Sequence, residues 1–113
     1  MRERVTDPRR VAELLASELD GRERGAYARL AVVDADPDAE PAPDGPAAYG
    51  VAVDGERVAT VRLYPDAATV EGDAALAEFA ADEDLPVDGT TVSVPDGAAV
   101  KRVARLLAER ATL

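Results

Sequence analysis

Apolar residues spaced three and four positions apart predict three helices in this chain. The first helix has Asp7 as its cap and Pro8 in its first turn. Its inner face carries Val11, Leu14, Leu15 and Leu19. The second helix follows a cap at Asp73, and its inner face carries Leu76, Phe79 and Ala80. The third follows Pro95-Asp96-Gly97 and has an apolar stripe made of Val100, Val103, Ala104 and Leu107.

Alternating apolar and polar residues predict strands, and the clearest signal is a hairpin. Residues 49–53 and 56–64 alternate on either side of Asp54-Gly55, a dipeptide typical of a type I′ turn. A regular hairpin around that turn places Tyr49 opposite Thr60. One face would then carry Tyr49, Val51, Val53, Val58, Thr60, Arg62 and Tyr64, and the other face Gly50, Ala52, Arg57, Ala59, Val61 and Leu63.

Three further strands are predicted at residues 26–34, 68–71 and 90–94, and residues 35–46 form a loop with four prolines and four acids. The element order is therefore α-β-β-β-β-α-β-α. We expect an α+β fold in a single domain over residues 1–113, with a mostly antiparallel sheet of about five strands and helices packed on one face.

Composition narrows the chemistry open to this chain. It contains no His and no Cys, so Ser-His-Asp and Cys-His nucleophiles, the usual zinc ligands and disulfides are excluded. We expect a protein that is not an enzyme and that carries no catalytic residue, cofactor or metal. There is no run of 18 apolar residues and no charged-then-apolar leader, which predicts a soluble, cytoplasmic protein.

The net charge is −10, from 23 acidic and 13 basic residues, and Lys101 is the single lysine. Such a surface suits a cytoplasm at molar salt, where a Debye length of about 3 Å makes charge repulsion cheap. We therefore expect a halophilic protein.

Basic residues gather in the two terminal helices, against the acidic trend of the chain. If those helices are neighbours, a surface that contacts an anion or nucleic acid would comprise Arg9, Arg10, Lys101, Arg102 and Arg105. The alternative is a solvated helix face whose cations pair with nearby carboxylates. That alternative is favoured, because few cations are present and molar salt weakens each phosphate contact.

Three further segments resemble functional sites only superficially. Residues 34–40 alternate acids as a calcium loop does, but Ala39 and Gly45 stand where such a loop needs Gly and Glu. Residues 96–101 lack the second glycine and the Gly-Lys-Ser/Thr end of a phosphate loop, so Asp96 is predicted to cap the helix. Residues 78–84 hold four acids on a surface turn, with no reason for a raised pKa.

The hairpin supports our first functional hypothesis, a non-enzymatic protein-interaction domain that binds a partner or forms a homodimer. If the helices cover the face with Val61 and Leu63, an exposed interaction surface would comprise Tyr49, Val51, Val58 and Tyr64. The alternative is that this face is the core and the face with Arg57 is wet. Nucleic-acid binding through the basic helix face is the second hypothesis.

Four segments carry a resemblance that spans nearly the whole chain. They are RVTDPRRVAELLASEL, VVDADPDAEPAPDG, YGVAVDGERVATV and VPDGAAVKRVARLL. In these segments the chain resembles a group of short, acidic haloarchaeal proteins of unknown function. The resemblance implies a shared fold, and it assigns no catalytic or ligand residue.

Overall fold

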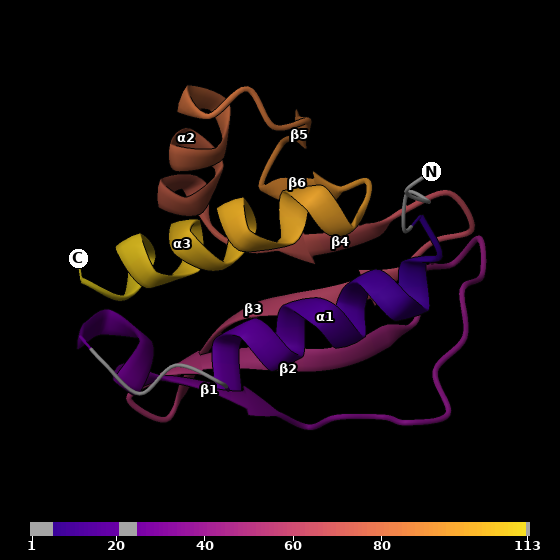
Figure 1. Cartoon of the computed structure of the whole chain (residues 1–113), viewed down its shortest axis with the longest axis horizontal. Helices are drawn as coiled ribbons and strands as arrows, with labels where there is room; N and C mark the ends of the chain where they lie inside the picture. Colours follow the sequence, from indigo (N-terminus) through magenta and orange to yellow (C-terminus); the bar gives the residue numbers. More distant parts are fainter. Residues whose placement is uncertain (1–5, 21–24, 113) are drawn as a thin grey trace.

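Six antiparallel strands form one sheet in a computed structural model that describes residues 6–20 and 25–112 (Figure 1). The strand order across the sheet is β1-β2-β3-β4-β6-β5. The strands are β1 (Leu30–Val33), β2 (Ala47–Val53), β3 (Glu56–Leu63), β4 (Ala68–Glu71), β5 (Val87–Asp88) and β6 (Thr91–Val94). The helices are α1 (Pro8–Asp20), α2 (Ala74–Asp82) and α3 (Val100–Ala111), with short 3₁₀ turns η1 (Gly25–Arg29) and η2 (Gly97–Ala99).

All three helices lie on the same side of the sheet. α1 packs on β1, β3 and β4 and runs beside α3, while α2 packs against α3 and the β5–β6 end of the sheet (Figure 1). Leucines are the largest of the fully buried side chains, and they are Leu15, Leu19, Leu63, Leu76, Leu106 and Leu107. The predicted α+β class, with an antiparallel sheet and helices on one face, is therefore confirmed.

Aspartates begin the helical segments as their positions predict. The Asp73 carboxylate accepts a hydrogen bond from the Leu76 amide at 3.0 Å and caps α2. The Asp96 carboxylate accepts one from the Ala99 amide at 3.1 Å and caps η2. These contacts satisfy amides that a helix start otherwise leaves without a partner.

The strand predicted over residues 26–34 is shorter in the structure. Its first part forms η1, and β1 begins only at Leu30. Residues 26–29 are Ala-Tyr-Ala-Arg, which lack β-branched side chains and include good helix formers, whereas Val32 and Val33 favour a strand. The structure also adds the two-residue strand β5, which pairs with β6.

The predicted β2–β3 hairpin forms, but its register is not regular. Asp54 and Gly55 both have positive φ, at 51° and 87°, as a type I′ turn requires. Beyond Val53 opposite Glu56, however, Ala52 lies opposite Arg57 and Val51 opposite Ala59. Val58 is therefore an extra residue on β3, a β-bulge, and the predicted pairing of Tyr49 with Thr60 is wrong because Tyr49 lies opposite Val61.

That bulge changes which side chains share a face. Ala59, Val61 and Leu63 all lie on the helix-covered face, and the shifted register brings Tyr49 and Val51 to the same face. The opposite face carries polar side chains such as Thr60 and Arg62, and Arg62 pairs with Glu71 at 3.1 Å. Neither predicted face composition is correct, because the bulge combines the apolar parts of both on one side.

Candidate interaction site

The strand β1 forms one edge of the sheet. In the part of the chain that the structure describes, β2 is the one strand that pairs with β1. Proteins usually protect such an edge with charges, proline or a bulge. The strand itself reads Leu30-Ala-Val-Val33 and contains none of the charges or prolines that would do so. Ala31 is exposed, and Val32 and Val33 are half-buried.

The hydrogen-bond pattern shows which backbone groups of β1 point outward. The Asp54 amide donates to the Arg29 carbonyl at 3.0 Å, so these opposed residues are a hydrogen-bonded pair. Hydrogen-bonded and non-hydrogen-bonded pairs alternate along an antiparallel ladder. From the register of β1 with β2, the N–H and C=O groups of Leu30 and Val32 therefore point away from β2.

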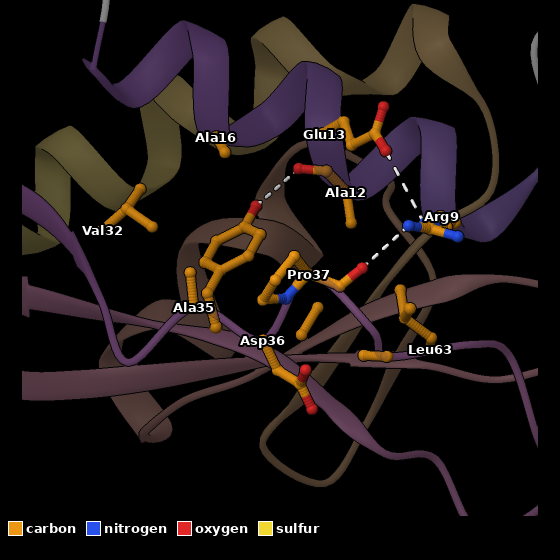
Figure 2. Close-up of a pocket in the computed structure, with 12 residues that line it drawn as sticks. Arg9, Ala12, Glu13, Ala16, Val32, Ala35, Asp36, Pro37 and Leu63 are labelled. Carbon is orange, nitrogen blue, oxygen red and sulfur yellow. Dashed lines mark hydrogen bonds and ion pairs between the residues drawn. The ribbon is translucent and has the colours of Figure 1, made fainter.

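An apolar cavity of about 270 Å³ adjoins this edge (Figure 2). One wall comes from α1, and the rest of the lining comes from β1, the loop that follows it, β2 and β3, so the cavity lies between a helix and the β1 side of the sheet. Its apolar lining is Ala12, Ala16, Val32, Ala35, Pro37, Ala39, Ala48, Tyr49 and Leu63. Ligand pockets for drug-sized molecules span roughly 300–1,000 Å³. This cavity lies just below that range, so it has room for an apolar side chain or a small ligand.

Tyr49 forms part of the cavity wall and is fixed in place. Its side chain is 5% exposed, and its hydroxyl donates a hydrogen bond to the Ala12 carbonyl of α1 at 2.8 Å. Burial, and secondarily the negative charge of Asp20, raises the pKa of Tyr49 well above its usual value. The phenol thus stays neutral at physiological pH and acts as a tie between β2 and α1.

The two ends of the cavity differ in polarity. At one end Arg9 donates to the Pro37 carbonyl at 2.8 Å and lies 3.8 Å from Glu13 (Figure 2). Val32 and Ala16 lie at the other end, next to the sheet edge (Figure 2). Arg9 and Glu13 are about half exposed, so neither is a desolvated charge of the kind that acid–base catalysis uses. The arrangement supplies shape and apolar surface.

The predicted interaction surface is not assembled as expected. Tyr49 and Val51 are 5% and 0% exposed, so their placement on a free surface is wrong. Val58, the bulge residue, is half-buried and lines a depression with Arg110 and Ala111 of α3. Tyr64 is half-buried beside Thr69 and Ser93, in a different pocket. The four residues therefore do not form one surface.

The predicted basic surface is divided between two places. Arg10 lies 3.4 Å from Glu13, which Arg9 also approaches, at the start of α1. Arg105 pairs with Glu83 at 2.8 Å, and Arg102 donates to the Glu83 carbonyl, at the end of α2. Lys101 is exposed on α3, which lies between α1 and α2 (Figure 1). Because these arginines contact oxygens of the protein, the structure adds no support for nucleic-acid binding, which stays a prediction.

Within residues 6–20 and 25–112, no three Asp or Glu side chains gather as a metal site would need. None of the helices in those ranges is long and apolar enough to cross a bilayer.

The sequence profile of a group described as "Family of unknown function (DUF7993)" matches residues 1–112. The chain belongs to this family. The match to DUF7993 includes the residues that form the sheet edge and the cavity. No curated protein and no solved structure matches the chain.

Reasoning from the sequence missed the site at β1 and α1. Ala12 and Ala16 are too small to stand out in a helical pattern, and the edge position of β1 depends on the order of strands across the sheet. One signal was present: an uncharged run, residues 30–33, directly before a loop rich in proline and acid. Connecting segments of this kind run over the protein surface, which favours a strand at the margin of the sheet.

Proposed function

We propose that this protein is a non-enzymatic protein-interaction domain that binds an extended segment of a partner by strand addition at β1. The partner segment would lie antiparallel to β1 and pair with the outward backbone groups of Leu30 and Val32. Main-chain hydrogen bonds give affinity in this binding mode, and pockets for alternate side chains give specificity.

The observation that carries the proposal is the position of the cavity relative to the edge. The backbone N–H and C=O groups of Val32 point away from β2, and its side chain forms part of the cavity wall. A strand added beside Val32 would therefore have its alternate side chains next to the mouth of the cavity. Ala12 and Ala16 leave room there for one aliphatic side chain.

Val32→Pro tests the proposal, because it removes the outward N–H of β1 while keeping the ladder to β2. Proline is tolerated where a strand N–H faces solvent. The probe is a phage-displayed library of random heptapeptides, selected on the folded wild-type protein in 1 M KCl. We expect selected peptides, made synthetically, to bind Val32→Pro at least about tenfold more weakly, which is roughly 1.4 kcal/mol. Fluorescence anisotropy measures the affinities.

Val32→Thr is the matched control, since it keeps the β-branched shape and the N–H; peptide affinity should change less than about threefold. Ala16→Leu is an independent variant that fills the cavity and leaves β1 untouched, and it should also weaken binding at least about tenfold. Circular dichroism checks that each variant folds. Failure to select any peptide, or undiminished binding to both Val32→Pro and Ala16→Leu, would refute the proposal.

A further inference from the structure

We infer that the segment which occupies the β1 edge is β1 of a second copy of the chain, so that two sheets join across a two-fold axis. This inference rests on the strand addition of the proposed function and names the partner strand. Leu30 of the second copy is 8% exposed in its own fold, so it would pair through its backbone and leave the cavity unfilled. It follows from the hydrogen-bond direction, the side chains and the charges along residues 29–34.

The backbone defines the register of such a pair. Residues whose N–H and C=O groups point toward each other must lie opposite one another, so Leu30 and Val32 pair with outward residues of the second copy. Placing Leu30 opposite Val32 of the second copy uses both outward residues of each strand. The two-fold axis then passes at Ala31, which faces Ala31 of the second copy.

Ala31 suits this central position. Directly opposed residues of a non-hydrogen-bonded pair approach to about 4.5 Å between Cα atoms, the closest cross-strand contact in a sheet. Ala31 is exposed and has a one-carbon side chain, so two copies meet there without a clash. It also places an uncharged residue at the point where like charges would repel most.

The charges at the two ends of β1 are complementary under this symmetry. Arg29 precedes the strand and pairs with Asp54 at 2.6 Å, and Asp34 follows it and pairs with Arg57 at 3.2 Å. An antiparallel partner brings the Arg29 end of one copy beside the Asp34 end of the other. Arg29 and Arg57 are each 43% exposed, and Asp34 is 73% exposed, so each pair is open to further contacts. The two ion pairs would form a cluster of alternating sign at each end.

This register makes Arg29 face Val33 of the second copy, which allows a test by exchange of charge. Arg29→Glu would place Glu beside Asp34 of the second copy, and Val33→Lys would place Lys opposite Arg29 of the second copy. Each variant alone should therefore dimerise at least tenfold more weakly than wild type. In a 1:1 mixture the new Glu faces the new Lys, and dimerisation should return to within about threefold of wild type.

Sedimentation equilibrium in 1 M KCl, where the net charge of −10 is screened, measures the dissociation constants. Circular dichroism confirms that both variants fold, and Thr60→Lys, a change on β3 away from the edge, is the control that should dimerise as wild type does.

The inference falls if the wild-type protein is a monomer at millimolar concentration, or if the mixture shows no recovery. A wild-type monomer that still binds selected peptides at β1, sensitive to Val32→Pro, would leave the proposed function standing and refute the second copy as its partner. A wild-type protein that neither binds selected peptides nor self-associates would refute both the proposed function and this inference.

Discussion

Tyr49 illustrates how one side chain joins the sheet to the helix layer. Replacing it with Phe keeps the ring in the cavity wall and removes the hydroxyl that donates to Ala12. A buried hydrogen bond contributes about 1 kcal/mol net, so we expect Tyr49→Phe to lower the free energy of unfolding by that amount. Denaturant titration in molar KCl measures it. A variant as stable as wild type would show that the contact adds nothing.

Tyr49 also predicts a dependence on alkaline pH. Its pKa is raised in the folded protein, whereas the phenol of the unfolded chain ionises near pH 10. The folded state therefore holds a proton that the unfolded state releases, and the free energy of unfolding falls as pH rises above about 10. Tyr49→Phe should lose this part of the slope. Equal slopes for the two proteins between pH 9 and 11 would contradict the assignment.

Sequence reasoning identified Tyr49 as a residue of interest but placed it on the wrong face. A side chain in a strand changes face when the register shifts by one residue, and the bulge at Val58 produces that shift. Valine is common at regular strand positions, so the identity of Val58 does not distinguish a bulge from a regular pair. The burial of Tyr49 therefore follows from the fold and could not be read from local alternation.

At the scale of elements, Asp73 connects α2 to α3. One carboxylate oxygen caps α2 at the Leu76 amide, and the other accepts from Arg110 of α3 at 2.6 Å. Partial burial acts to raise the pKa of Asp73, but the Leu76 amide and Arg110 outweigh it, and the pKa lies below its usual value. The same side chain therefore both starts a helix and positions its neighbour.

We expect Asp73→Ala to lower the free energy of unfolding by about 1 kcal/mol, chiefly through loss of the cap. Asp73→Asn keeps a capping oxygen and should cost less, because the ion pair is partly exposed and contributes little. Since the folded pKa is depressed, the ionised carboxylate contributes stability above about pH 4, and this is lost as pH falls through the folded pKa. Denaturant titrations at pH 7 and pH 3 measure both effects; an Asn variant less stable than the Ala variant would contradict the capping argument.

The elements themselves were largely predictable, since each depends on local patterns. Asp73 and Asp96 were expected as caps. The turn at Asp54-Gly55 was expected because a type I′ turn requires positive φ at two residues, which Asp-Gly adopts readily. β5 was missed because two residues are too few to show alternation. Local chemistry thus defines where most elements lie, and the sheet order defines what they expose.

For the whole molecule, charge governs how stability responds to salt. A net charge of −10 on 113 residues produces repulsion that favours expansion at low ionic strength. We expect the melting temperature at pH 7 to rise between 0.1 M and 1 M KCl, as the Debye length falls from about 10 Å to 3 Å. Near pH 4.4, where the net charge is close to zero, the gain should be much smaller. Calorimetry measures the melting temperatures. Equal increases at both pH values would show that salt acts by strengthening apolar burial and not by screening charge.

The fold class was predictable at this scale, but the candidate site was not. Helical and strand periods gave an α+β protein with helices on one face, as the structure has it. The site depends on β1 being an outer strand and on α1 packing against it. Both depend on how the whole chain assembles, so residues 8–33 alone do not reveal them. Sequence patterns predict local elements, whereas the exposed edge is a property of their assembly.

The far edge of the sheet limits how large an assembly can become. β5 has only two residues, Pro86 precedes it and Gly89 follows, so it offers little to an incoming strand. A sheet that could grow at both edges would polymerise into a fibre without a defined end. With one receptive edge in the described part of the chain, the proposed strand pairing between copies would stop at a stoichiometry of two.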